Sequence, residues 1–361
     1  MSYDMAKSVH ENYVTIVKAL GIILMVIGHS GCPQMLSKYI YLFHMPLFFF
    51  CSGIFWKTIS DKDAAFSFLR KRIVCLYIPF VKWSILFLLL HNLFMFMGIY
   101  NQYYGFEGGS RYYSLGDIGA KSFFILFTMH EYEELLGGFW FIRALLISSF
   151  LVAGSSLLLN KVKRNRNELL CLLYFLLTIV IRRFFPDPEF WRDVSMGMFG
   201  AFFFMLGYVA LRISSYWHNK YVCAICFVSM ILSYYYFEDG ISMGCGYNKV
   251  FPFSISGVSG TLLILYISKL IEKRTSVVKK ILYYIGNHTL VILALHFLAF
   301  RFVSYLLVIA NGMDVRLVAE HPVIASVSTP FFWWIVYSLV GVVLPIMLVI
   351  FCQCIRFLKN M

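Results

Sequence analysis

The stretch VTIVKALGIILMVIGHSG, at residues 14–31, decides the fold class of this chain. Apolar runs of about 18 to 25 residues cross a bilayer as helices, whereas buried core helices need only about 10 to 14. A weaker apolar piece at 118–129 is too short to cross, and we expect it to lie at the membrane interface or to re-enter. Further strong runs follow at about 38–56, 73–98, 138–159, 168–182, 193–212, 220–237, 251–271, 281–309 and 331–356. The sequence therefore predicts an all-α, polytopic membrane helix bundle with about ten transmembrane helices.

The composition excludes a disordered or ordinary water-soluble protein. Of the 361 residues, 60% are hydrophobic and 14% are charged, whereas soluble domains carry about 25% charged residues. The longest stretch outside the apolar runs is 99–137, so we expect one transmembrane domain over residues 1–361 and no soluble domain. Cys223 and Cys226 form a CxxC inside an apolar run without a second pair, so no metal site is expected.

The net charge of +13 is better explained by membrane topology than by nucleic-acid binding. If the N-terminus is cytoplasmic, Lys and Arg favour the inner segments by about two to one. The positive-inside rule then places both termini in the cytoplasm. No cleavable signal precedes the first run, which we expect to be retained as a span.

The first run contains two ionisable residues on one helix face. Lys18 and His29 are eleven positions apart, which brings both side chains to within about 20° of each other and separates them by about 16 Å along the axis. Ionisable groups inside a membrane are costly and usually mark function. The alternative is a lysine that snorkels to the headgroups and a histidine that merely ends the helix.

Other cationic or titratable residues are expected at the same depth, in the outer half of the membrane. They suggest a polar cavity that opens outward, although His44 alone would also suit a hydrogen bond between packed helices. Pro46 is expected to kink the second run. The residues at this depth are His29, His44, Arg143, His296 and Arg301.

Two further features have ordinary explanations beside functional ones. Trp140 stands close to Arg143 in the sequence, and it suits either an aromatic-belt anchor or a contact to substrate. Arg70, Lys71 and Arg72 precede the third run on the cytoplasmic side. Such a cluster sets orientation or contacts lipid headgroups, and it equally suits a phosphate-rich ligand.

Several motifs resemble the membrane-bound acyltransferase 3 family, in particular its fucose 4-O-acetylase-like branch of sugar O-acetyltransferases. The similarity is spread over most of the chain, and its first two motifs together are quite specific. The motifs are Lys18 with His29, FHMPLFFFCSG at 43–53, RKRIVCLYIP at 70–79, GFWFIRAL at 138–145, FFFMLGYVAL at 202–211 and YIGNHTLVILALH at 284–296.

The resemblance implies an enzyme that moves an acyl group, usually acetyl, from cytoplasmic acetyl-CoA to a hydroxyl of an envelope sugar or glycan on the outer side. It implies a multi-pass protein of the bacterial inner membrane, with lipid bilayer, acyl-CoA and glycan as partners and neither metal nor nucleic acid. Three positions depart from the family pattern: Thr15 where an acidic residue is common, Cys75 in the basic loop, and Arg143 where an apolar residue is frequent.

The expected donor site consists of Lys18 and the 70–72 cluster, which would bind the phosphates of CoA. His29 would then act either as general base toward the sugar hydroxyl or as the covalent acceptor of the acyl group. His44 or Arg143 would stabilise the oxyanion. The expected acceptor contacts are Trp140, Arg143, His296 and Arg301.

Two rival functions remain open from the sequence. A transporter or flippase of a lipid-linked sugar would use the same cations to bind phosphate without transferring an acyl group. A sensor is disfavoured because no soluble output module is visible.

Overall fold

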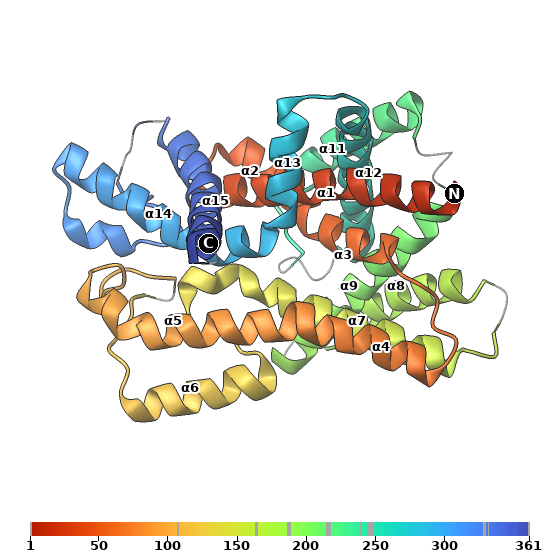
Figure 1. Cartoon of the computed structure of the whole chain (residues 1–361), viewed down its shortest axis with the longest axis horizontal. Coiled ribbons are helices and arrows are strands. Elements are labelled where there is room, and N and C mark those ends of the chain that lie inside the picture. The colour runs from red at the N-terminus through yellow and green to blue at the C-terminus, as the bar shows by residue number, and fades with distance from the viewer. Residues whose placement is uncertain are drawn as a thin grey trace. The chain divides into compact units, whose positions relative to one another are not determined.

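The computed structural model describes residues 2–106, 108–162, 165–185, 189–213, 218–238, 240–243, 249–327, 330 and 332–359. Throughout these residues the regular structure is helical and contains no β-strand, as Figure 1 shows. The predicted all-α fold class is therefore confirmed.

The chain forms two compact units, each assembled from segments that are distant in the sequence. Unit 1 comprises residues 1–21, 38–77 and 141–287, and unit 2 comprises residues 22–37, 78–140 and 288–361. The first helix, α1 (Ser2–His29), begins in unit 1 and ends in unit 2. The short helix α2 (Gln34–Tyr41) also contributes residues to both units.

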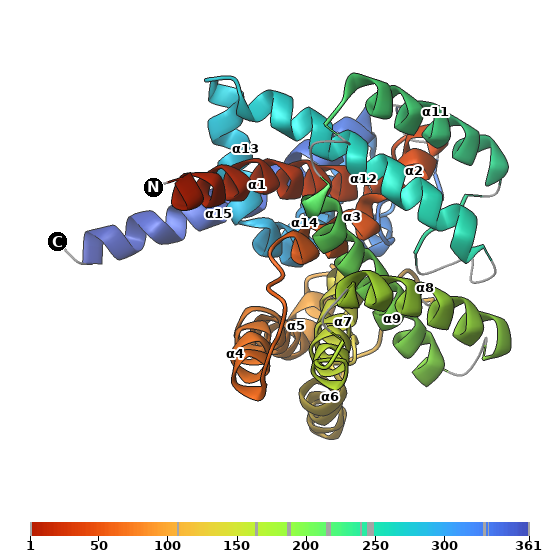
Figure 2. The same cartoon turned by 90° about the vertical axis from the view of Figure 1, so that its right-hand side faces the viewer.

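Unit 1 contains most of the helices from the middle of the chain. Its elements are α3 (His44–Ile54), α4 (Lys62–Arg72), the π-helical turn η1 (Ile73–Tyr77), α7 (Trp140–Leu158, from Phe141 on), α8 (Arg166–Phe184), α9 (Glu189–Arg212), α11 (Lys220–Tyr236), α12 (Val250–Glu272) and α13 (Val277–Asn287). In this unit α3 packs against both α9 and α12, and α8 packs along α9. Helix α11 packs along α12, as Figure 2 shows.

Two glycines allow α3 and α9 to cross in direct backbone contact. A Cβ atom added to Gly53 would overlap the carbonyl oxygen of Phe204, and one added to Gly207 would overlap the carbonyl oxygen of Phe50. The two contacts are reciprocal, because each helix presents a glycine to a carbonyl of the other. Small residues of this kind let transmembrane helices approach closely.

Replacing Gly207 with alanine should destabilise the protein by about 1–3 kcal/mol, the usual cost of overpacking. The added methyl group has only backbone to displace, so the helices must separate. Thermal unfolding of the detergent-solubilised protein measures the effect. Gly154→Ala in α7 is the matched control, since a Cβ there meets nothing within 4 Å. Equal melting temperatures for the two variants would contradict the close crossing.

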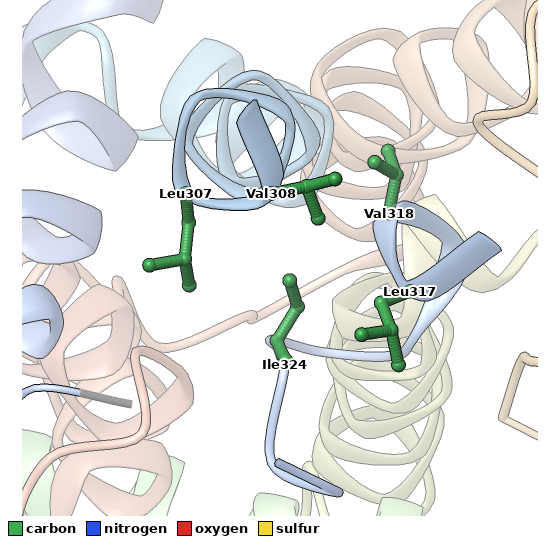
Figure 3. Close-up of a cluster of buried hydrophobic side chains, with 5 residues drawn as sticks. All are labelled: Leu307, Val308, Leu317, Val318 and Ile324. Carbon is green, nitrogen blue, oxygen red and sulfur yellow. The ribbon is translucent and has the colours of Figure 1, made fainter. Parts of the chain in front are cut away.

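Unit 2 contains two groups of packed helices. In the first, α6 (Leu115–Thr128) lies alongside α5 (Ile78–Phe96), as Figure 1 shows. In the second, α14 (Thr289–Asn311) packs against α15 (Trp333–Lys359) and two short 3-10 helices, η2 (Glu134–Phe139) and η3 (Val315–Ala319). Five buried side chains from α14, η3 and the loop after it form one hydrophobic cluster, drawn in Figure 3: Leu307, Val308, Leu317, Val318 and Ile324.

Six helices in the described part of the chain are long and apolar enough to cross a membrane: 62–96, 134–158, 191–212, 250–272, 289–311 and 333–355. Two shorter apolar helices span 13–29 and 220–236. The multi-helix membrane architecture is thus supported, while the number of about ten spans and the cytoplasmic termini stay predictions.

The run predicted as one span at 38–56 is divided into α2 and α3. The Nδ1 atom of His44 donates to the carbonyl oxygen of Ile40 at 2.9 Å, so the side chain takes the place of the backbone donor that would continue the helix. Pro46 therefore lies in the first turn of α3, where a missing N–H costs little, instead of kinking a longer helix. Helix α3 begins at His44, a residue that was expected to lie inside one continuous span.

The run predicted at 281–309 is also divided, between α13 and α14. The interruption falls at His288, where φ is −117° and ψ is 21°. It follows Asn287, and both residue types have low helix propensity. The weaker piece at 118–129 forms α6, which begins with a capping box between Ser114 and Asp117. Hydrogen bonds from Ser114 lower the pKa of the Asp117 carboxyl.

Candidate functional site

Lys18 and His29 lie on one uninterrupted helix, as the sequence predicts. Both side chains are half-buried, and His29 is the last residue of α1. Eleven residues of α-helix separate them by about 16 Å along the axis. Lys18 belongs to unit 1 and His29 to unit 2.

His29 lies beside a second histidine in unit 2. The ring centroids of His29 and His296 are 5.8 Å apart, and the ring of Phe297 is 5.1 Å from His29 and 3.9 Å from His296. His296 has no exposed surface. Two imidazoles and an aromatic ring thus form one cluster between the end of α1 and the first half of α14.

Arg301, one turn further along α14, is buried and ion-paired. Its Nη2 atom donates to Oε1 of Glu134 at 2.8 Å, and its Nη1 atom donates to the carbonyl oxygen of Glu320. The other carboxylate oxygen of Glu134 accepts the backbone N–H of Phe106 at 2.8 Å. Arg301 was expected to contact substrate, but its terminal nitrogens are engaged within the protein.

A third histidine, His321, connects the ion pair to the histidine cluster. Its ring centroid is 4.6 Å from that of Phe297, and its Nδ1 atom is 3.4 Å from Nη2 of Arg301. Burial, followed by repulsion from Arg301 and His296, lowers the pKa of His321 to about 3. The ring is therefore neutral at physiological pH and accepts a hydrogen bond from the guanidinium.

A second buried acid–base pair contains Glu133, the residue immediately before Glu134 in the sequence. Nδ1 of His91 is 3.0 Å from Oε2 of Glu133, and Nε2 of His91 is 2.9 Å from the carbonyl oxygen of Arg111. A carbonyl oxygen only accepts, so Nε2 carries a hydrogen and a further proton lies between Nδ1 and the carboxylate. The ring of Tyr113 stacks on His91 at 3.5 Å.

The acidic residues of this region are not among the site residues predicted from the sequence. Glu133 and Glu134 were counted with a polar outer segment, and His91 was passed over inside the third apolar run. The sequence did contain two signals, a histidine within one span and two carboxylates at the start of another. Because ionisable groups inside a membrane are costly, such residues usually mark function. His321 gave no such signal, because it lies in a loop between two apolar runs.

The remaining outer residues lie elsewhere. His44 and Arg143 belong to unit 1, where His44 donates to Ile40 and Arg143 pairs with Asp193 of α9 at 3.0 Å. Trp140 begins α7 and is half-buried in unit 2. The structure therefore brings His29, His296 and Arg301 into one region of unit 2, and gives His44 and Arg143 partners of their own in unit 1.

The cations expected to bind the donor all belong to unit 1. Arg70 and Lys71 are exposed, whereas the guanidinium of Arg72 lies 5.0 Å from the ring centroid of Phe68. In the part of the chain that the structure describes, no carboxylate forms an ion pair with these residues or with Lys18. The cluster is followed directly by η1, a π-helical turn of the kind found at functional sites.

Comparison with known protein families identifies a match over most of the chain. A family model described as an acyltransferase domain, of the acyltransferase 3 type, matches residues 11–350. No curated protein and no solved structure matches the chain.

Proposed function

The chain belongs to this acyltransferase family, and on that premise we propose that it is an acyl-CoA-dependent membrane O-acyltransferase. It transfers an acetyl group from cytoplasmic acetyl-CoA to a hydroxyl of an envelope sugar or glycan on the outer side of a bacterial cytoplasmic membrane. The observation that carries this proposal is the position of His29, at the end of an apolar helix and beside a buried imidazole.

The donor side of the proposal is supported by unpaired positive charge. Lys18 is half-buried, and no described carboxylate neutralises it. A buried charge without a partner is costly, so an anionic ligand is favoured there. Arg70, Lys71 and Arg72 offer further charge for the phosphates of CoA, with the guanidinium of Arg72 held against Phe68.

The acceptor side is built from unit 2. His296 lies beside His29 and Phe297. Arg301 and Trp140 are proposed as further acceptor contacts, and Trp140 offers an aromatic surface of the kind on which sugars stack. Arg143 and His44 remain proposals for acceptor binding and oxyanion stabilisation. The pairing of Arg143 with Asp193 assigns it a charge partner already present in the protein.

His29 is the group that the chemistry requires. An unprotonated imidazole nitrogen can take the proton of a hydroxyl, and it is also a competent nucleophile toward a thioester. Either role places the acyl carbon next to His29.

The proposal is tested by incubating membranes that contain the protein with radiolabelled acetyl-CoA and following the label by mass spectrometry of the glycan. We expect acetylated glycan from the parent chain and none from His29→Ala. If a lipid-linked sugar crosses the membrane at equal rates with both chains and no label is transferred, the protein is a flippase instead.

Replacing Lys18 with methionine should weaken donor binding by about 10- to 100-fold, which corresponds to the loss of a hydrogen bond to a charged group. The methionine stem keeps the packing of α1 but removes the charge. Calorimetric titration with CoA measures the affinity, and Lys18→Arg is the control that restores it. Equal affinity for Lys18→Met and the parent would favour a lysine that only reaches the headgroups.

A further inference from the structure

The hydrogen bonds of His296 determine which of its nitrogens carries a proton. Nδ1 lies 2.9 Å from the carbonyl oxygen of Leu293 and 3.2 Å from that of Ile292. Since a carbonyl oxygen can only accept, Nδ1 must carry the hydrogen. In the neutral ring the lone pair then belongs to Nε2.

The lone pair on Nε2 has no partner within the part of the chain that the structure describes. The ring is completely buried, and Nε2 is among the buried polar atoms without a hydrogen bond. Buried polar atoms are nearly always satisfied, so an exception calls for a ligand or a catalytic role. The atom that satisfies an imidazole lone pair is a hydrogen on oxygen or nitrogen, which means that the missing ligand is a donor.

The position of His296 shows that the missing hydrogen-bond donor must lie close to His29. Its ring centroid is 5.8 Å from that of His29, and Phe297 packs against both rings. The positive charge of Arg301 on the same helix is already matched by Glu134. The hydrogen bond from Nδ1–H to the carbonyl oxygen of Leu293 fixes the orientation of the ring.

We propose that His296 is a second catalytic residue, the base that removes the proton of the acceptor hydroxyl, and that His29 is the covalent carrier of the acyl group. The inference rests on the proposed function and divides its chemistry between the two rings. One histidine cannot serve efficiently as acyl carrier and as base in the same step, and the unsatisfied lone pair supplies the second group.

The first step loads His29. Its unprotonated nitrogen attacks the carbonyl carbon of the acyl thioester, a carbon–nitrogen bond forms, and the carbon–sulfur bond breaks. The sulfur leaves with the electron pair and takes the remaining ring proton, so the products are CoA thiol and a neutral acyl-imidazole on His29.

The second step transfers the acyl group from His29 to the acceptor hydroxyl. The acceptor oxygen attacks the acyl carbon while its proton moves to Nε2 of His296, and the carbon–nitrogen bond breaks with its electrons on His29. The proton then returns from His296 to His29, so both rings end neutral and the ester is released.

The test uses the full chain in detergent, radiolabelled acetyl-CoA as donor and octyl β-glucoside as a probe for the sugar hydroxyl. His296→Asn retains an amide N–H that can donate to Leu293 but places nothing at Nε2. His296→Gln places an amide near Nε2 that can accept a hydrogen bond but cannot take up a proton. Loading is followed by rapid quench and protein-bound label, and unloading by labelled octyl glucoside.

Both variants should lose transfer to octyl glucoside by about a hundredfold or more, which is the usual contribution of a general base. Both should still bind CoA as the parent does and should accumulate label on His29, which His29→Ala abolishes. Transfer at the parental rate in His296→Asn would assign His296 to packing alone. If the parent transfers label without any label bound to the protein, His29 is the base and does not carry the acyl group. A parent chain that consumes no acetyl-CoA would instead remove the proposed function itself.

Discussion

Replacing His29 with alanine is expected to reduce acyl transfer by about a thousandfold or more, because the group that contacts the acyl carbon is removed. The affinity for CoA should change little, since the phosphates are expected at Lys18, about 16 Å away along α1. Mass spectrometry of the product and calorimetry of CoA binding measure the two effects separately. This is the largest effect on activity that the structure predicts.

The control for His29→Ala is Lys18→Met, which should affect donor binding and not the chemical step. Lys18→Met should lose donor affinity and recover much of its rate at high acetyl-CoA, whereas His29→Ala should bind donor and remain inactive at any concentration. Acylated glycan at the parental level from His29→Ala would remove this residue from the chemistry.

The largest effect on stability is expected for Glu134→Ala. The side chains of Arg301 and Glu134 are 2% and 10% exposed, so removing the carboxylate leaves a guanidinium buried without its counterion. Breaking one partner of a buried ion pair costs about 3–5 kcal/mol. Thermal and urea unfolding in detergent should report this loss, together with loss of the acceptor for the N–H of Phe106.

Two further variants separate charge from packing. Glu134→Ala combined with Arg301→Met should regain most of the stability, because a buried pair replaced by apolar groups is often neutral. Glu168→Gln removes one partner of an exposed pair with Arg212 and should cost less than about 1 kcal/mol. If Glu134→Ala unfolds no more easily than Glu168→Gln, the buried pair does not hold unit 2 together.

The sequence predicted the parts of the fold that depend on local composition. Long apolar runs such as 251–271 and 331–356 became α12 and α15 because length and hydropathy alone determine such helices. The relation between Lys18 and His29 was predictable for the same reason, since it needs only the geometry of one helix.

Features that depend on contacts between distant residues were not predictable. The division of 38–56 is a local feature that also escaped prediction, because a hydropathy pattern does not reveal that the side chain of His44 donates to Ile40. The burial of Glu134 depends on Arg301, which lies far along the chain on α14. Nor did the sequence show that His296 presents an unsatisfied lone pair, because the tautomer follows from the carbonyl of Leu293.

The adjacent residues Glu133 and Glu134 pair with partners on different helices, and this has an evolutionary consequence. Glu133 pairs with His91 on α5, and Glu134 pairs with Arg301 on α14. A lineage that lost the charge at position 301 would inherit a buried carboxylate without a counterion, and selection would then favour loss of the acid at 134. Substitutions at these two sites should therefore be inherited together across descendants, independently of those at 91 and 133, although the two acids are adjacent in the gene.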